Sequence, residues 1–111
     1  MKIPQDIAAA VHERAGYQCE ACGGYLFADA SALHHRKAKG MGGTSFDLNT
    51  VANLMQVHGD TRGGINCHNV TEYSIHQNPT RSKRLHHIVP PWENPEDSTP
   101  VVCHELFKLR A

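Results

Sequence analysis

The placement of cysteine and histidine constrains this chain more than any other feature of its sequence. Cys19 and Cys22 form a Cys-x-x-Cys pair followed by Gly23-Gly24, and Cys67 stands far downstream. Apolar residues make up 40% of the 111 residues and aromatic residues only 6%, so a single domain of this length has a thin hydrophobic core. Such a fold benefits from a further cross-link, which four cysteines and nine histidines can provide.

Neither a secretory signal peptide nor an apolar run long enough to cross a membrane stands out in the sequence, so we expect a cytoplasmic chain without membrane contact. In that compartment thiols stay reduced, and a Cys-x-x-Cys pair indicates metal ligation before a disulfide. Eleven Lys and Arg balance eleven Asp and Glu, which argues against a protein that simply coats nucleic acid. The local basic stretches "HHRKAK" and "TRSKRLHH" are still sufficient to contact a phosphate backbone.

Hydrophobic spacing and turn residues predict a single α+β domain over residues 1–111. A helix is expected over Gln5–Ala15, where Gly16 ends it, and short strands are expected in "ASALHHR" and "NLMQVH". A second helix is predicted from Cys67 to about His76, before "QNP". The segments "HHIVPPW" and "VVCHELFKL" alternate apolar and polar residues and predict a C-terminal β-hairpin, with the prolines between them at the turn.

The cysteine pair needs two more soft or imidazole ligands to close a tetrahedral zinc site. His58 and Cys67 are the best candidates, because they bracket a loop that follows a predicted strand. Together with Cys19 and Cys22 they would form a structural Zn²⁺ knuckle that joins two loops. The simpler alternative is a buried Cys67 and an ordinary loop histidine at His58. Cys103 has no partner by spacing.

A second set of residues matches the needs of phosphodiester hydrolysis by water. That reaction requires a base, a divalent cation at the scissile phosphate and a group that keeps the base oriented. The adjacent His34 and His35 offer a ligand and a base, Asn53 offers a hydrogen-bonded brace, and His68 offers a second ligand. Neighbouring side chains of an extended strand point to opposite faces, so the histidine pair is expected at a strand end.

The stretches "CEACGGYL", "LHHRKAKGMGG", "NTVANLMQVH" and "NCHNVTEY" resemble the HNH endonucleases, whose catalytic unit is the ββα-metal (His-Me finger) fold. The likeness continues through "HHIVPPWENPEDSTPV", covers most of the chain and is closest to the small bacteriophage and actinobacterial branch. It implies a ββα-metal core at about residues 17–79 with a structural zinc knuckle. The predicted N-terminal helix and C-terminal β-hairpin would flank this core.

The resemblance also implies a role for each motif residue. His34 and His68 correspond to ligands of the catalytic divalent ion, His35 to the general base and Asn53 to the motif asparagine. His58 stands where the family has a zinc cysteine.

The resemblance also implies a further ligand of the catalytic ion, a histidine or an acid, four residues after His68, where this chain has Glu72. In a regular helix His76 would lie about 12 Å along the axis from His68, too far to share an ion. Glu72 is therefore the preferred third ligand, and His76 is the alternative if the segment is bent or the helix begins after His68. The catalytic ion implied is Mg²⁺ or Mn²⁺, with Ni²⁺ or Zn²⁺ as alternatives.

Two groups of cations are candidates for nucleic-acid binding. The first lies beside the histidine pair and the second at the end of the predicted helix, where a solvated surface explains them about as well. They are Arg36, Lys37, Lys39, Arg81, Lys83 and Arg84. His86 and His87 are interpreted as the entry to the hairpin, with DNA contact as an alternative.

These observations lead to the hypothesis of a metal-dependent endonuclease that nicks or cuts DNA in a bacterial host cell. The family resemblance extends this to phage DNA packaging with a terminase as partner. Two alternatives remain open: a non-catalytic, zinc-stapled nucleic-acid-binding module, and a toxin-like nuclease acting on RNA. The sequence leaves monomer and homodimer equally open.

Overall fold

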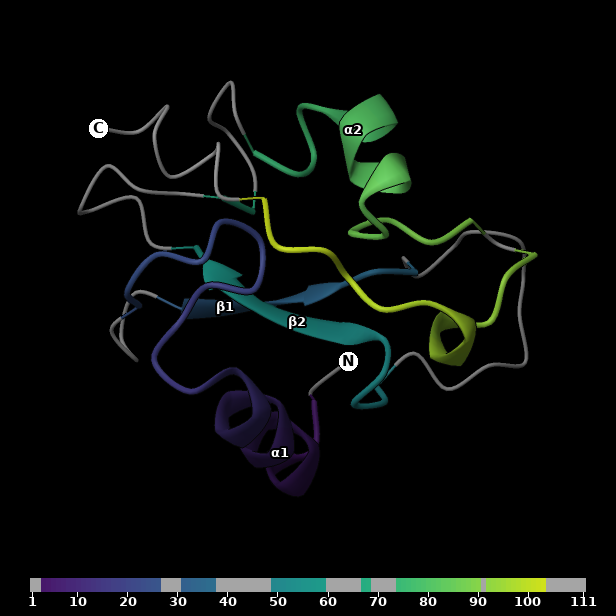
Figure 1. Ribbon diagram of the computed structural model, residues 1–111. Coiled ribbons are helices and arrows are strands. Elements are labelled where there is room, and N and C mark those ends of the chain that lie inside the picture. Colours follow the sequence, from purple (N-terminus) through teal and green to yellow (C-terminus); the bar gives the residue numbers. More distant parts are fainter. Residues whose placement is uncertain are drawn as a thin grey trace.

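The structure, a computed structural model, describes residues 3–26, 31–37, 49–59, 67–68, 74–90 and 92–103. These residues form a small α+β unit with two helices, a two-stranded antiparallel sheet and one short 3₁₀ helix. The elements are α1 (Gln5–Ala15), β1 (Ser31–His35), β2 (Leu54–His58), α2 (Pro79–Arg84) and η3 (Pro95–Asp97). Figure 1 shows the strands crossing the centre of the molecule, with α1 on one side and α2 on the other.

Helix α1 forms where the sequence predicts it. Pro4 precedes its first turn, Val11 is buried against the sheet, and Gly16 ends it with a φ of 65° that glycine adopts without strain. The side-chain amide of Gln56 on β2 donates hydrogen bonds to the carbonyl oxygens of Gly16 (3.1 Å) and Gln18 (3.2 Å). The end of α1 is thereby fixed to the sheet.

Both predicted strands are present and pair with each other. In their register His34 lies opposite Met55, and Leu33 lies opposite Gln56. Directly opposed residues of an antiparallel pair share a face, so His34 lies on the face of Met55 and away from the face of Gln56 and α1. All five residues of β2 are buried, which makes this strand the centre of the molecule.

The prediction of a helix from Cys67 to about His76 is wrong for the part of that stretch the structure describes, namely 67–68 and 74–76. The amide of Ile75 donates to the carbonyl of Cys67 (2.8 Å), and the amide of His76 donates to that of His68 (3.2 Å). Hydrogen bonds across eight residues close a loop, whereas an α-helix joins residues four apart. The helix begins later, at Pro79, whose fixed φ suits the first turn.

The C-terminal hairpin was predicted over segments that the structure describes in part. Residues 86–90 and 101–103 contain no strand, and residues 104–111 lie outside the described residues. The ring Nε2–H of His87 donates to the carbonyl of Val101 (2.7 Å), so the two segments do meet. Between them Pro95 begins η3, and the side chain of Asn94 caps it by accepting a hydrogen bond from the amide of Glu96.

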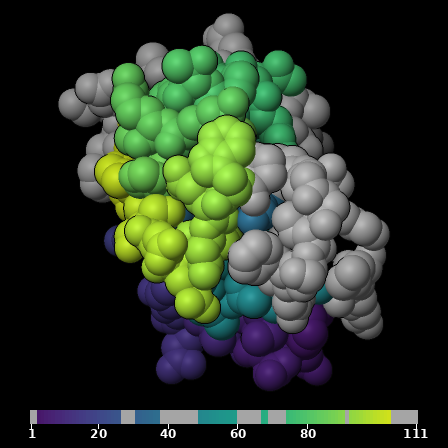
Figure 2. All heavy atoms as spheres, turned by 90° about the vertical axis from the view of Figure 1, so that its right-hand side faces the viewer, coloured from purple at the N-terminus to yellow at the C-terminus, as the bar shows by residue number. Residues whose placement is uncertain are grey.

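The hydrophobic core is small and centred on the cysteines. Figure 2 shows segments 74–90 and 92–103 packed side by side over one flank of the molecule. The principal core cluster consists of Cys19, Ala21, Cys22, Leu26, Met55, Val57, Cys67 and Ile75.

None of the described helices is both long and apolar enough to cross a membrane.

Candidate metal centres

Four side chains of the predicted knuckle come together in the core, and we call them the cysteine–histidine group. The ligand atoms of Cys19, Cys22, His58 and Cys67 lie within 4.8 Å of one another, and all four residues are buried. Nδ1 of His58 is 3.6 Å from Sγ of Cys22 and 3.5 Å from Sγ of Cys67. A buried group of three thiols and one imidazole is a donor set that could hold a metal ion such as zinc.

The local backbone explains how the cysteine–histidine group forms. The amide of Cys19 donates to the carbonyl of Gly24 (2.9 Å), and the amide of Gly23 donates back to the carbonyl of Cys19 (2.8 Å). Gly23 has a φ of 79°, which a residue with a side chain rarely adopts. Nε2–H of His58 donates to the carbonyl of Tyr25 (2.8 Å), so Nδ1 is the atom turned towards the sulfurs.

The electrostatics of the cysteine–histidine group favour thiolate at Cys19 and oppose it at Cys67. Burial alone would lower the pKa of His58, but hydrogen bonds to the thiols of Cys19 and Cys22 outweigh it and raise that pKa to about 9. Hydrogen bonds from Cys22 and Cys67 lower the pKa of the Cys19 thiol. Hydrogen bonds to Cys19 and Cys22 raise the pKa of Cys67. Thiolate is the form that binds metal.

A second group, which we call the triple-histidine group, draws its members from distant parts of the chain. The ligand atoms of His34, His68 and His76 also lie within 4.8 Å of one another. Ring centroids are 5.2 Å apart for His34 with either partner and 4.8 Å apart for His68 with His76. His34 is buried, His68 is intermediate and His76 is exposed, so this group opens to solvent on one side.

His34 is held in a single tautomer. Its Nε2–H donates to the backbone carbonyl of His87 (2.7 Å), while its buried Nδ1 has no hydrogen-bond partner among the described residues. Desolvation lowers the pKa of His34 to about 3, and burial likewise lowers the pKa of His68 to about 4. Both imidazoles are therefore neutral near pH 7, which leaves lone pairs available for an ion.

The third member of the triple-histidine group is His76. The expectation that it would lie too far from His68 assumed a regular helix, whereas the amide of His76 donates to the carbonyl of His68 and the two rings are in contact. Glu72, the preferred third ligand, lies outside the described residues.

His35 is the last residue of β1 and follows the buried His34, as a pair at a strand end requires. Nε2–H of His35 donates to Oδ1 of Asn49 (2.8 Å), and this leaves Nδ1 with a lone pair. Asn49, which is 7% exposed, was not singled out from the sequence. Nothing in the local sequence "NTVAN", which begins with Asn49 and ends with Asn53, marks Asn49 as a partner of His35.

Asn53 braces the turn after β1. Its Oδ1 accepts a hydrogen bond from the amide of Lys37 (2.8 Å), and its Nδ2 donates to the carbonyl of the same residue (3.2 Å). The side chain is 1% exposed, and its backbone carbonyl accepts from the amide of Arg36 (2.8 Å). This double hydrogen bond fixes the chain immediately beyond His35.

The predicted phosphate contacts beside the histidine pair need correction. Arg36 and Lys37 are 1% and 0% exposed, so neither side chain can reach a nucleic-acid backbone in this conformation. Desolvation lowers the pKa of Arg36 to about 10. Lys37 donates from Nζ to the carbonyl of Glu93 (3.1 Å). Lys39 lies outside the described residues.

The second cationic group lies on α2. Lys83 and Arg84 are exposed there, and Arg81 is partly buried with a hydrogen bond from Nη2 to the carbonyl of Ser74 (3.3 Å). These side chains belong to the helix itself, because α2 begins at Pro79 and ends at Arg84.

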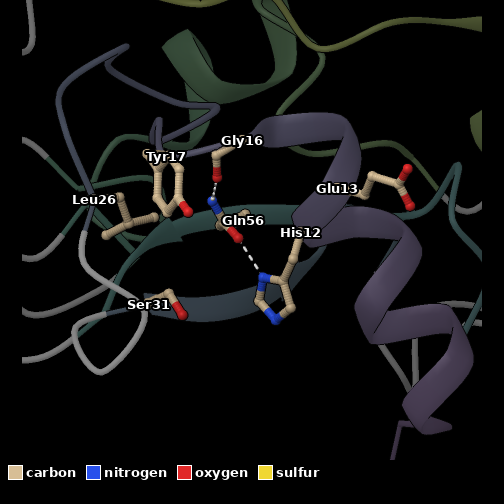
Figure 3. A pocket seen from close by; sticks show the side chains of 7 residues that line it. All are labelled: His12, Glu13, Gly16, Tyr17, Leu26, Ser31 and Gln56. Atoms are coloured by element: carbon tan, nitrogen blue, oxygen red, sulfur yellow. Dashed lines mark hydrogen bonds between the residues drawn. The ribbon is translucent and has the colours of Figure 1, made fainter.

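A cavity of about 420 Å³ lies between α1 and the face of the sheet that carries Gln56, opposite the face of His34 (Figure 3). Its lining is His12, Glu13, Gly16, Tyr17, Leu26, Ser31 and Gln56. In Figure 3 the amide of Gln56 lies between Gly16 and His12, and its oxygen is hydrogen-bonded to Nδ1 of His12. No lining residue belongs to either ligand group, so this cavity is separate from both.

No protein family, curated protein or solved structure matches this chain. Its function therefore has to be inferred from the two ligand groups and their surroundings.

Proposed function

We propose that this chain is a metal-dependent HNH-type endonuclease that hydrolyses DNA phosphodiester bonds. One observation supports the proposal above all: the triple-histidine group, the oriented His35 and the Asn53 brace occur together at one end of β1. The sequence motifs that resemble HNH endonucleases contain His34, His35, Asn53 and His68, and His76 was the alternative third ligand.

In this proposal the chain's own groups prepare water for attack. Asn49 accepts the Nε2 proton of His35 and fixes the ring, so Nδ1 is free to take a proton from water. Asn53 keeps the backbone after His35 in place. His34, His68 and His76 would hold a divalent ion, which when bound supplies a positive charge for the scissile phosphate.

The donor set bears on which ion is bound. Imidazole nitrogen suits zinc, nickel and copper, whereas magnesium and manganese prefer carboxylate and water oxygen. The three described donors are all imidazoles. We therefore favour Ni²⁺ or Zn²⁺ over Mg²⁺ at the triple-histidine group, and Zn²⁺ at the cysteine–histidine group.

The burial of Arg36 and Lys37 removes two cations from the expected DNA surface, which weakens that surface equally for the nuclease and for the second candidate, a zinc-stapled nucleic-acid-binding module. Exposed Lys83 and Arg84 on α2 remain as phosphate contacts in either case. A terminase partner and a bacterial host are supported only by the family resemblance, which leaves the oligomeric state open.

Nicking of supercoiled plasmid by wild type and His35→Ala tests the proposal, with Mg²⁺, Mn²⁺, Ni²⁺ or EDTA and with zinc content measured. We expect ion-dependent nicking by wild type and a loss of about 10²- to 10⁴-fold in His35→Ala, the usual contribution of a general base. His12→Ala is the matched control, because His12 also bonds to an amide oxygen but belongs to neither ligand group.

Equal activity of His35→Ala and wild type would remove His35 from the reaction. A folded, zinc-loaded wild type that binds duplex DNA but leaves it intact with every ion would support the binding module. Cleavage of RNA alone would support the toxin-like nuclease.

A further inference from the structure

Residues 85–90 and 92–101 are held against the end of β1 by the buried side chains of Arg36 and Lys37. Figure 1 shows this stretch running from α2 past η3 and back across the sheet. The amide of Val89 donates to the carbonyl of Arg36 (2.9 Å), and Lys37 reaches the carbonyl of Glu93 (3.1 Å). Two cations that the sequence suggested for DNA therefore serve contacts inside the protein.

The guanidinium of Arg36 makes most of these contacts. Nε donates to the carbonyl of His86 (2.8 Å), and Nη2 donates to Oγ of Ser98 (2.6 Å). Nη1 donates to the carbonyls of Ala52 (2.7 Å) and Pro95 (3.0 Å). One planar group thus ties together the turn before β2, η3 and the segment after α2.

His86 links this guanidinium to the triple-histidine group. Among the non-glycine residues that the structure describes, only His86 has a positive φ, 62°. Its carbonyl accepts from Arg36, and the next carbonyl along the chain, that of His87, accepts from Nε2–H of His34 (2.7 Å). The ring of His87 is fully buried, and its Nε2–H donates to the carbonyl of Val101 (2.7 Å). This second hydrogen bond also fixes the position of His87, whose carbonyl accepts from His34.

We propose that Arg36 is a positioning residue for the metal ligand His34. By holding the peptide of His86, it places the carbonyl of His87 where it keeps the proton of His34 on Nε2 and leaves Nδ1 for the ion. The inference rests on the proposed metal site of the triple-histidine group and is independent of whether DNA is cut.

Arg14 provides a comparison within the same molecule. Its guanidinium donates to the carbonyls of Val51 (2.8 Å) and Leu54 (2.7 Å) and pairs with Glu20 (2.7 Å). Arg14 and Arg36 both stabilise the turn that leads into β2. Of the two, Arg36 alone is hydrogen-bonded to the described residues of the segment that carries His87. A purely structural role predicts the same outcome for both arginines.

The test compares Arg36→Lys and Arg14→Lys in zinc-loaded protein, since lysine keeps the charge but loses the planar fork. Two readouts are measured: affinity for added Co²⁺ or Ni²⁺, and the His34 tautomer from imidazole ¹⁵N shifts before the second ion is added. We expect about 10- to 100-fold weaker binding and a mixture of tautomers in Arg36→Lys, the usual effect of losing an outer-shell partner. Arg14→Lys should match wild type in both readouts.

A second pair of variants decides the matter if Arg36→Lys fails to fold. His86→Gly tolerates the positive φ and should bind the second ion like wild type, whereas the β-branched side chain of His86→Val opposes that φ and should weaken binding. Wild-type affinity and tautomer in Arg36→Lys, or in His86→Val, would overturn the inference, as would equal losses in Arg14→Lys.

The wild-type protein separates this inference from the proposed function. If wild type takes no second ion yet cuts DNA, the inference fails and the nuclease stands. If wild type binds the second ion but cuts no DNA, the nuclease proposal fails and the inference about Arg36 stands or falls on the ion affinities alone.

Discussion

The cysteine–histidine and triple-histidine groups adjoin in the chain at Cys67 and His68 but differ in surroundings. The carbonyl of His58 accepts from both amides, at 2.9 Å from Cys67 and 3.1 Å from His68, so one peptide anchors a ligand of each group. Every member of the cysteine–histidine group is buried, whereas exposure in the triple-histidine group increases from His34 to His76. A closed thiol-rich group suits a structural ion, and an open imidazole group suits an ion that meets a substrate.

Dependence of folding on the ion is where the two groups should differ most. Cys67→Ser removes a ligand from the group at the centre of a small core, and structural zinc typically contributes about 10–16 kcal/mol to the folding of small zinc domains. We expect loss of zinc and of cooperative unfolding, measured by metal analysis and by circular dichroism during heating. Cys103→Ser, outside the group, should keep both. A folded Cys67→Ser without zinc would show that the core suffices without the cross-link.

His76→Ala tests the open group. Its side chain is exposed, so its removal should change the free energy of unfolding by less than about 0.5 kcal/mol. Affinity for the second ion should fall by more than about 100-fold, because loss of an outer-shell partner alone costs about 10- to 100-fold. Titration of Ni²⁺ into zinc-loaded protein measures this. Unchanged affinity would exclude His76 as a ligand.

Acid should act on the triple-histidine group in the direction that its pKa values set. Burial lowers the folded pKa of His34 to about 3, below the ordinary value near 6.5, so between these limits the unfolded chain binds the extra proton. Stability conferred by neutral His34 is present above about pH 6.5 and is lost on acidification by up to about 1.4 kcal/mol per pH unit. His68 is more exposed, and solvent screening makes its contribution smaller.

Urea unfolding of zinc-loaded wild type and His34→Gln across this pH range measures the slope. The variant should unfold with a shallower dependence on pH, and because both proteins keep the cysteine–histidine group, the difference isolates His34. Identical slopes would mean that His34 is as readily protonated in the folded state as in the unfolded one.

Much of the local structure could be predicted because it depends on neighbours in the chain. The spacing of Ile7 and Val11 with Gly16 behind them predicts α1, and the strands follow from alternating or apolar runs. The Cys-x-x-Cys pair with Gly23 defines a tight turn, and His58 and Cys67 are its best partners by spacing as well as by geometry. Asn53 was expected to brace the loop between the strands, and its side chain makes two hydrogen bonds to Lys37.

Other assignments could not be made from spacing. His76 joins the triple-histidine group because its amide bonds to the carbonyl of His68, eight residues earlier, an arrangement that differs from the regular helix assumed from the sequence. Arg36 and Lys37 appeared as surface cations because the sequence does not reveal that Leu85–Val101 packs over them. Asn49 and the carbonyl of His87 gave no signal at all, since an amide oxygen or a backbone carbonyl has no distinctive residue pattern.

The sequence by itself therefore determined the donor types, the first helix, the two strands and the knuckle, all of which depend on residue chemistry and short-range periodicity. Only the tertiary structure decided which ligand atoms lie close together, which ring nitrogen of His34 remains for an ion and which cationic side chains are buried. The physical reason is that ligation and burial depend on distances between residues far apart in the chain. His34 and His87 are 53 residues apart, and no local rule encodes the 2.7 Å between them.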